Sequence, residues 1–126
     1  MSKARQELGA QGERLAEAWL VRAGWRIIGR RFRSGHRDID LVAERGEEGD
    51  RTIAFIEVKT RLSPAYGGPL GAVHWRKQRE MARAARDWIS RFRRPGEQYR
   101  FDVIGVTQKK EMEPEIIHLE NAFSVG

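Results

Sequence analysis

The sequence contains no cysteine, which excludes a disulfide framework and any metal site built on thiolates. It also lacks long apolar runs, and its beginning, MSKARQELGAQGE, has none of the apolar character of a signal peptide or membrane span. Repeats and low-complexity segments are absent as well. We therefore expect a cytoplasmic protein with no membrane partner, and a length of 126 residues suits a single domain over 1–126.

Negative charge is in the minority, with 18 Asp and Glu against 24 Lys and Arg, and the net charge is +6. Most of the basic residues are arginine, whose guanidinium groups bind phosphate well. One cluster comprises Arg30, Arg31, Arg33 and Arg37, and a second comprises Arg76, Lys77, Arg79, Arg83, Arg86, Arg91, Arg93 and Arg94. A polyanionic partner is indicated. The alternative is a solvated basic surface in a protein whose genome prefers arginine codons.

The apolar periodicity predicts a helix, three strands, a second helix and two further strands. The predicted helices span 6–23 and about 72–92, and the predicted strands span 25–33, 38–44, 52–61, 99–107 and 115–120. A polar turn over 45–50 and a loop rich in Pro and Gly over 62–71 separate these elements. A helical crossover between strands favours parallel pairing, so the pattern predicts an α/β fold with a mixed central sheet flanked by helices.

The segment FIEVKTR carries two charges inside an otherwise apolar strand. Side chains alternate along a strand, so Glu57 and Lys59 share a face with Phe55, while Ile56 and Val58 point the other way. This face is apolar up to Glu57 and then becomes ionic. The pattern is typical of a strand that ends at a functional site, although exposed edge-strand charges paired with neighbours would also give it.

The preceding strand contributes more carboxylates. Strand alternation predicts that Asp38 and Asp40 share one face and that Ile39 and Leu41 lie on the other. If the hairpin pairs the two strands antiparallel, Asp40 lies directly across from Glu57. Two facing carboxylates repel each other and need a cation, and hard oxygen ligands at this spacing suit Mg²⁺ or Mn²⁺.

Lysines near these carboxylates extend the candidate site. Lys59 is placed to orient or activate a water, or to stabilise charge on a phosphoryl oxygen. Lys77 lies in the middle of the apolar arc of the second helix, where it either reaches the carboxylates or extends its amine over the core to water. Glu13 lies at the edge of the apolar arc of the first helix, where its pattern is that of a surface charge.

Other polar residues give weaker evidence of a functional site. The histidines His36, His74 and His118 fall in three different elements without ligand spacing, so a zinc site is not expected. Asp102 follows Arg100 in an apolar strand and is either a structural ion-pair member or a contributor to the same site.

The ordered residues Glu13, Asp40, Glu57, Val58 and Lys59 resemble the D…ExK core of the PD-(D/E)xK nuclease superfamily, which has the restriction-endonuclease-like fold. Over nearly the whole chain the sequence also resembles the YraN-like family of small bacterial proteins. The segments that carry this second resemblance are GERLAEAWLVRAGW, DIDLVA, IAFIEVKTR, GAVHWRKQREMARAARDWI, YRFDVIGV and HLENAF.

The resemblance implies an αβββαβ nuclease core with a divalent metal. In it, Asp40, Glu57 and the backbone carbonyl of Val58 hold Mg²⁺ or Mn²⁺, and Lys59 serves the attacking water. Glu13 matches a glutamate on the first helix that also serves the metal site in Holliday-junction resolvases of the superfamily.

Two further positions bear on the resemblance. Lys77 matches a lysine that recurs in the family pattern and is counted with the catalytic residues. The family usually has Gly-Glu where this chain has Arg37-Asp38, so a role for Asp38 does not follow from the resemblance.

We therefore expect a metal-dependent endonuclease that acts on branched or flapped nucleic acid, DNA more than RNA, and that could work as a homodimer. The alternative is a module of the same fold that binds nucleic acid without cutting it. The basic residues expected to bind nucleic acid are Arg30, Arg31, Arg33, Arg37, Arg61, Arg76, Arg79 and Arg83.

Overall fold

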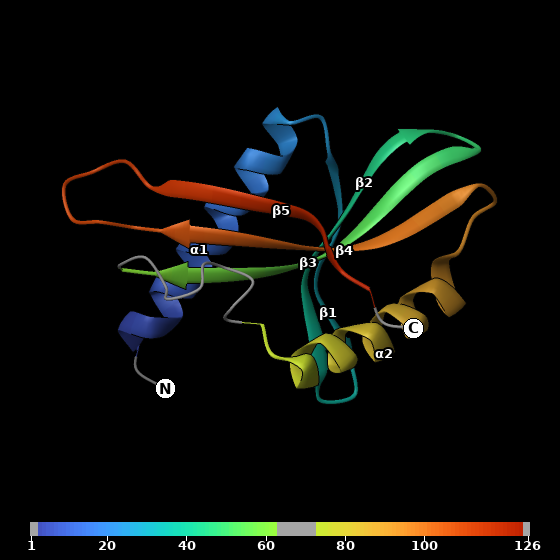
Figure 1. The fold of residues 1–126 in the computed structure, drawn as a ribbon, viewed down its shortest axis with the longest axis horizontal. Helices are drawn as coiled ribbons and strands as arrows, with labels where there is room; N and C mark the ends of the chain where they lie inside the picture. The colour runs from blue at the N-terminus through green and yellow to red at the C-terminus, as the bar shows by residue number, and fades with distance from the viewer. Residues whose placement is uncertain (1–2, 63–72, 125–126) are drawn as a thin grey trace.

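The computed structural model describes residues 3–62 and 73–124, and the order of its elements confirms the predicted one (Figure 1). The helices are α1 (Lys3–Arg22) and α2 (Trp75–Phe92). The strands are β1 (Arg26–Ser34), β2 (Arg37–Glu47), β3 (Asp50–Arg61), β4 (Glu97–Thr107) and β5 (Glu115–Phe123). Neither described helix is both long and apolar enough to cross a membrane.

The five strands form one mixed sheet in the order β1-β2-β3-β4-β5. The pairs β1–β2, β2–β3 and β4–β5 are antiparallel, and β3–β4 is parallel. The parallel pair is the one joined through α2, as a helical crossover requires. The predicted mixed α/β sheet is therefore confirmed, with β3 between β2 and β4.

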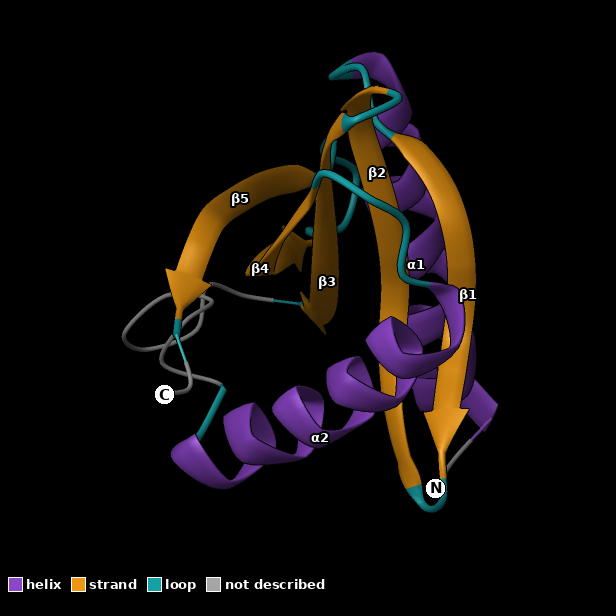
Figure 2. Cartoon of the chain, turned by 90° about the vertical axis from the view of Figure 1, so that its right-hand side faces the viewer, coloured by secondary structure: helices purple, strands orange, loops and turns teal. Residues whose placement is uncertain are grey.

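The two helices cover opposite sides of the sheet, each over its own apolar cluster (Figure 2). Under α1, Ala16 and Leu20 pack against Leu41, Ile56 and Ile104 from three neighbouring strands. Their side chains are almost fully withdrawn from water. This burial fixes α1 across the middle of the sheet.

The cluster under α2 is richer in aromatic rings. Ala84 and Trp88 of the helix pack on Ile53 and Phe55 of β3, and the Phe32 ring meets Trp88 edge to face at 5.2 Å between centroids. Ile53 and Phe55 thus lie on the α2 side, whereas Ile56 lies on the α1 side, as strand alternation predicts for β3.

Some predicted boundaries are wrong by a few residues. The second helix begins at Trp75 and not near 72, because His74 is still extended at ψ 159°. The polar turn is shorter than 45–50, since β2 continues to Glu47 and β3 begins at Asp50. Apart from Leu62, the predicted loop over 62–71 lies outside the described residues.

The alternation predicted for β2 fails at Asp40. Ile39 packs in the cluster under α2, whereas Leu41 packs in the cluster under α1, so these two side chains do not share a face. The β1–β2 ladder skips Asp40, and the residue of β1 at this place, Arg31, has a positive φ of 47°. The β2–β3 ladder ends at the pair Leu41–Ile56. This interruption frees Asp40 from regular pairing on both sides.

Candidate functional site

Asp40 and Glu57 lie where the β2–β3 ladder ends. The observed register is the predicted one and would make them the next pair after Leu41–Ile56. In place of a ladder bond, Oδ2 of Asp40 accepts a hydrogen bond of 2.8 Å from the backbone N–H of Val58. The side chain of Asp40 also hydrogen-bonds to Glu57. The two carboxyl groups therefore lie in direct contact beside β3.

This contact changes the acidity of Asp40. The pKa of Asp40 is raised to about 8, first by burial and then by the adjacent charge of Glu57 and the hydrogen bond to it, while the Val58 N–H opposes the shift. Near neutral pH the pair therefore retains a proton, which a divalent cation would have to displace.

Two lysines surround Glu57, which is only 4% exposed on a central strand and so is not an exposed edge charge. Nζ of Lys59 lies 3.5 Å from Oε2 of Glu57, and Nζ of Lys77 lies 3.8 Å from the same oxygen. Lys77 is also 3.7 Å from Oδ1 of Asp38. Of the two interpretations of Lys77, the structure has the one in which its amine reaches the carboxylates.

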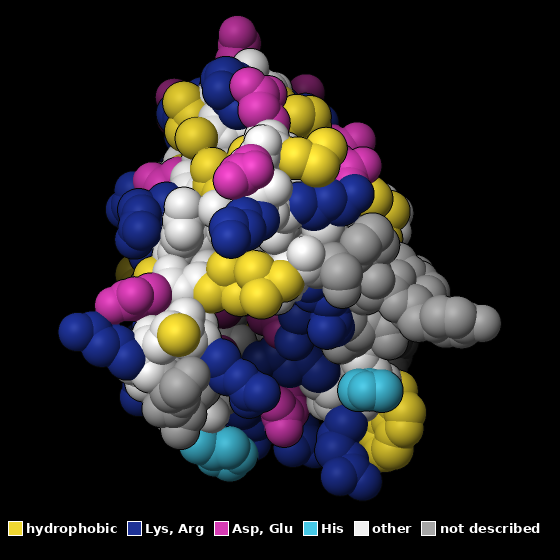
Figure 3. Space-filling model, turned by 90° about the vertical axis from the view of Figure 1, so that its left-hand side faces the viewer, with side chains coloured by type: hydrophobic (Ala, Val, Ile, Leu, Met, Phe, Trp, Pro, Cys, Tyr) yellow, Lys and Arg dark blue, Asp and Glu magenta, His cyan; other side chains and the backbone are white. Residues whose placement is uncertain are grey.

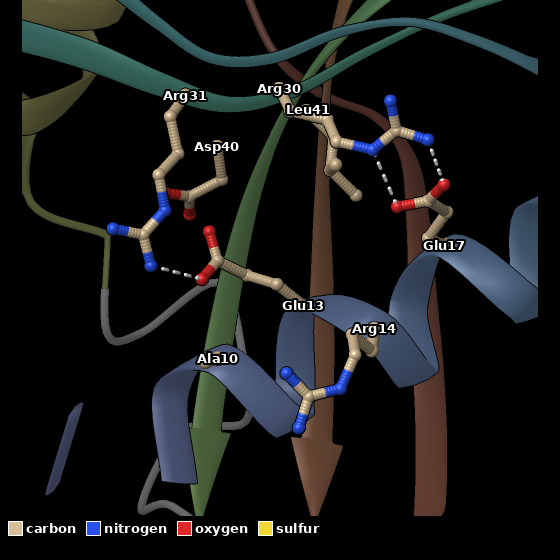
Figure 4. A pocket seen from close by; sticks show the side chains of 8 residues that line it. All are labelled: Ala10, Glu13, Arg14, Glu17, Arg30, Arg31, Asp40 and Leu41. Carbon is tan, nitrogen blue, oxygen red and sulfur yellow. Dashed lines mark hydrogen bonds and ion pairs between the residues drawn. The ribbon is translucent and has the colours of Figure 1, made fainter. Parts of the chain in front are cut away.

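Glu13 approaches the same group from α1. Figure 4 shows the carboxylates of Glu13 and Asp40 pointing toward each other, with the Arg31 guanidinium beside them. Nη2 of Arg31 donates to Oε2 of Glu13 at 3.0 Å. Burial, followed by the charge of Asp40, raises the pKa of Glu13, and the contact with Arg31 partly opposes this. Glu13 is thus a partly buried neighbour of Asp40 and not a plain surface charge.

Glu13, Arg31 and Asp40 line a pocket of about 320 Å³ between α1 and the strands β1 and β2. Its lining residues are Ala10, Glu13, Arg14, Glu17, Arg30, Arg31, Asp40 and Leu41. Figure 3 shows one face of the molecule on which Lys and Arg side chains gather around acidic ones. Carboxylates with surrounding cations form a setting in which a phosphate and a divalent metal could both bind.

Part of the predicted basic surface is used within the protein. The Arg30 guanidinium pairs with Glu17 of α1, and Arg31 pairs with Glu13. In the second cluster, in addition to Lys77, Arg91 pairs with Asp87, and Arg94 pairs with Glu44 and Glu97. Of the arginines expected to bind nucleic acid, those exposed and without an ion pair in the described residues are Arg33, Arg61, Arg76, Arg79 and Arg83.

The ligand atoms of Glu13, Asp40 and Glu57 are not gathered into a tight group of three. Within residues 3–62 and 73–124, one group of three potential metal ligands (His, Cys, Asp or Glu) has its ligand atoms within 4.8 Å of one another. This group is Asp102, His118 and Glu120. The pair Asp40–Glu57 still fits Mg²⁺ or Mn²⁺, because one or two carboxylates suffice when water and phosphate supply the other ligands.

Sequence reasoning missed the group on β4 and β5. Asp102 is fully buried, and its carboxylate contacts His118 Nε2 at 2.7 Å and the Asn121 N–H at 2.9 Å. Arg100 pairs with Asp102 at 3.0 Å and with Glu120 at 2.9 Å. The geometry could hold a metal, yet Arg100 already neutralises two of its three members. Of the two interpretations of Asp102, the structure has the ion pair.

A family model and individual relatives of this chain all carry the same family name. The sequence model described as "Uncharacterised protein family UPF0102" matches residues 12–106. A UPF0102 protein of Trichlorobacter lovleyi is 43% identical over 126 residues, which is all of this chain and 97% of that protein. A UPF0102 protein of Geobacter metallireducens is 42% identical over 126 residues, covering 100% and 99%. One of Rhodococcus opacus is 39% identical over 116 residues, covering 92% and 95%.

Proposed function

Because this chain belongs to the uncharacterised protein family UPF0102, whose name gives no reaction, we propose a function from the site: a metal-dependent endonuclease that hydrolyses phosphodiester bonds. We propose with it that the sheet and helices form a restriction-endonuclease-like core. The substrate we propose is branched or flapped nucleic acid, DNA more than RNA, because residues 3–62 and 73–124 include no element suited to reading base sequence.

The observation that carries the proposal is the contact of Asp40 and Glu57 beside Lys59. A pair of adjacent carboxyl groups, one buried and one half-buried, is costly unless something resolves the repulsion between them. The ammonium of Lys59 lies 3.5 Å from Glu57 on the same side of β3. Two carboxylates followed by a lysine two residues further on form an arrangement that suits phosphodiester hydrolysis with a bound divalent cation.

Each residue has a distinct role in this proposal. Mg²⁺ or Mn²⁺, when bound, supplies a Lewis acid for the scissile phosphate. Asp40 and Glu57 hold it, with the Val58 carbonyl as the expected backbone ligand. Lys59 orients the attacking water, and Lys77 balances the remaining charge of Glu57 at 3.8 Å. Glu13 contacts the metal site through the side of Asp40 that faces α1.

A cleavage panel tests the proposal. Branched, flapped, single-stranded and duplex DNA and RNA are incubated with Mg²⁺ or Mn²⁺ and with the wild type, Asp40→Asn or Lys59→Met. Lys109→Met is the matched control, because Lys109 is exposed and its one ion pair within the described residues is with the exposed Glu115. We expect cleavage by the wild type and the control, and a loss of at least a hundredfold in the two site variants.

The possible outcomes separate catalysis from binding. Binding without cleavage by the wild type would reject the endonuclease and leave the alternative, a nucleic-acid-binding module of the same fold. Equal cleavage by wild type and Asp40→Asn would point to a contaminating nuclease and also reject the proposal.

A thermal shift tests the metal site without any substrate. Ligands that bind only the native state raise the melting temperature. We expect Mn²⁺ to raise it in the wild type and to have no effect in Asp40→Asn. A shift that persists in Asp40→Asn but disappears in His118→Ala would move the metal to the group on β4 and β5.

A further inference from the structure

Trp75, the first residue of α2, exposes 62% of its surface to water and belongs to neither apolar cluster. An exposed indole ring does not contribute the stabilisation that its burial would give to the folded state. The guanidinium groups of Arg76 and Arg79 lie 5.6 and 5.9 Å from the centre of its ring. Trp75 is therefore an exposed aromatic surface accompanied by positive charge, which is the combination that single-stranded nucleic acids bind.

The ring lies at one end of a line of arginines along α2. At 100° per residue, the residues on this line fall within one narrow arc of the helix. They are Trp75, Arg79, Arg83 and Arg86, and each is exposed. We call them the α2 stripe. No acidic residue lies on it, and within the described part of the chain its arginines form no ion pair, whereas Arg91 further along the helix pairs with Asp87.

The stripe begins in the same turn of α2 that contributes Lys77 to the candidate site. Lys77 is two residues after Trp75, and its amine reaches Glu57 at 3.8 Å and Asp38 at 3.7 Å. The first turn of α2 thus carries both a contact to the carboxylates and the exposed ring. A nucleic-acid strand whose phosphates follow the stripe would bring its bases to Trp75, at the same end of α2 as Lys77 and on the opposite face of the helix.

We infer that Trp75 stacks on an unpaired base of the substrate while the arginines of the α2 stripe bind the adjoining phosphates. This inference rests on the proposed function and narrows it. The ligand is a nucleic acid with a single-stranded segment next to the cleaved position, such as a flap or a splayed arm. A continuous duplex keeps its bases stacked on one another and offers the ring no partner.

The experiment measures binding in EDTA, so that it does not depend on cleavage. Fluorescence anisotropy gives the Kd of the wild type, Trp75→Ala and Trp75→Phe for a flapped DNA and for a blunt duplex of equal charge. Trp19→Ala is the matched control, because Trp19 is also partly exposed, at 36%, but lies on α1. Far-UV circular dichroism and melting curves verify that each variant is folded.

We expect Trp75→Ala to weaken binding of the flapped DNA roughly tenfold, within the range for loss of one base–aromatic stack. The change for the duplex should stay below about twofold, and Trp75→Phe should retain most of the affinity. A scan of abasic positions along the flap should find one at which the wild type loses the same factor. Trp75→Ala should be insensitive to that position, as expected for two groups that contact each other.

Each other outcome overturns the inference. Equal weakening of both DNAs, or the same loss in Trp19→Ala, would show that Trp75 does not recognise an unpaired base. If the wild type bound no nucleic acid at all, the proposed function would fail as well. Normal binding with an unchanged Kd in Trp75→Ala would reject this inference alone.

Discussion

At the scale of single residues, Asp40 performs two tasks that depend on one structural defect. Both ladders are interrupted at Asp40, and its carboxylate accepts the hydrogen bond of the Val58 N–H. The same interruption brings the carboxyl group against Glu57. A regular strand at this position would satisfy its backbone with ladder bonds and would hold the carboxylates less closely.

This arrangement predicts how stability depends on pH. Because the pKa of Asp40 is raised to about 8 in the folded protein, its unfolded form ionises first as pH rises from about 4. The folded state therefore loses stability between about pH 4 and pH 8. Asp40→Asn removes this loss, so we expect it to melt several degrees above the metal-free wild type at pH 8 and to differ little at pH 4.5.

Melting curves in EDTA across this range measure the effect. The control is Asp50→Asn, since Asp50 is exposed at the β2–β3 turn and should leave the pH profile unchanged. A wild-type profile that is flat between pH 4.5 and 8 would contradict the raised acidity of Asp40.

At the scale of the elements, one close approach allows α1 to lie directly against β3. A Cβ on Gly12 would lie 1.8 Å from Oγ1 and 2.9 Å from Cβ of Thr60 on β3. Gly12 therefore lets the helix lie directly on the strand that carries Glu57. The next residue, Glu13, reaches the site for this reason.

Gly12→Ala should therefore be destabilising, although alanine is the better helix former. We expect overpacking to cost about 1–3 kcal/mol, which exceeds the gain in helix propensity of about 1 kcal/mol. Gly9→Ala is the matched control, because nothing lies within 4 Å of a Cβ there and the variant should gain about 0.5–1 kcal/mol. Urea denaturation measures both, and a stabilised Gly12→Ala would contradict the close packing.

The sequence predicts the elements better than it predicts the side chains of the site. The periodicity of apolar residues is sufficient to predict α1 and α2. An antiparallel hairpin with alternating side chains is sufficient to predict that Asp40 lies opposite Glu57 in the register. Alternation then fails at Ile39 and Leu41, because a ladder interruption depends on the positive φ of Arg31 and leaves no mark in the apolar pattern.

Contacts between distant strands explain what else the sequence did not reveal. The approach of His118 to Asp102 arises from the β4–β5 pairing next to an irregularity between Phe101 and Val103. Likewise, the ion pairs that occupy Arg30 and Arg31 require knowledge of how α1 lies on β1. Spacing along the chain carries no information about either.

At the scale of the whole molecule, the net charge of +6 is less informative than its distribution. Several arginines neutralise buried or partly buried carboxylates, such as Arg26, Arg51 and Arg94 around Glu44. The charge left for a polyanion is concentrated on surfaces such as the α2 stripe. Binding should therefore depend on which charges are removed and not only on how many.

The salt dependence of nucleic-acid binding distinguishes the location of the basic residues from their total number. Each phosphate contact adds about 0.9 to the slope of log K against log salt for duplex DNA, and about 0.7 for single strands. Replacing Arg79, Arg83 and Arg86 of the α2 stripe with glutamine should therefore lower the magnitude of the slope by roughly 2–3. Anisotropy titrations of the flapped DNA between about 50 and 200 mM salt measure it.

The decisive comparison removes the same amount of charge elsewhere. Lys3, Lys109 and Lys110 are exposed and lie away from α2, so their replacement with glutamine leaves the same net charge as the stripe variant. If the contacts are local, this variant keeps nearly the wild-type slope, because counterions are released only where phosphates meet basic side chains. Equal slopes in the two variants would instead mean that the molecule attracts nucleic acid through its overall field, and the α2 stripe would lose its assigned role.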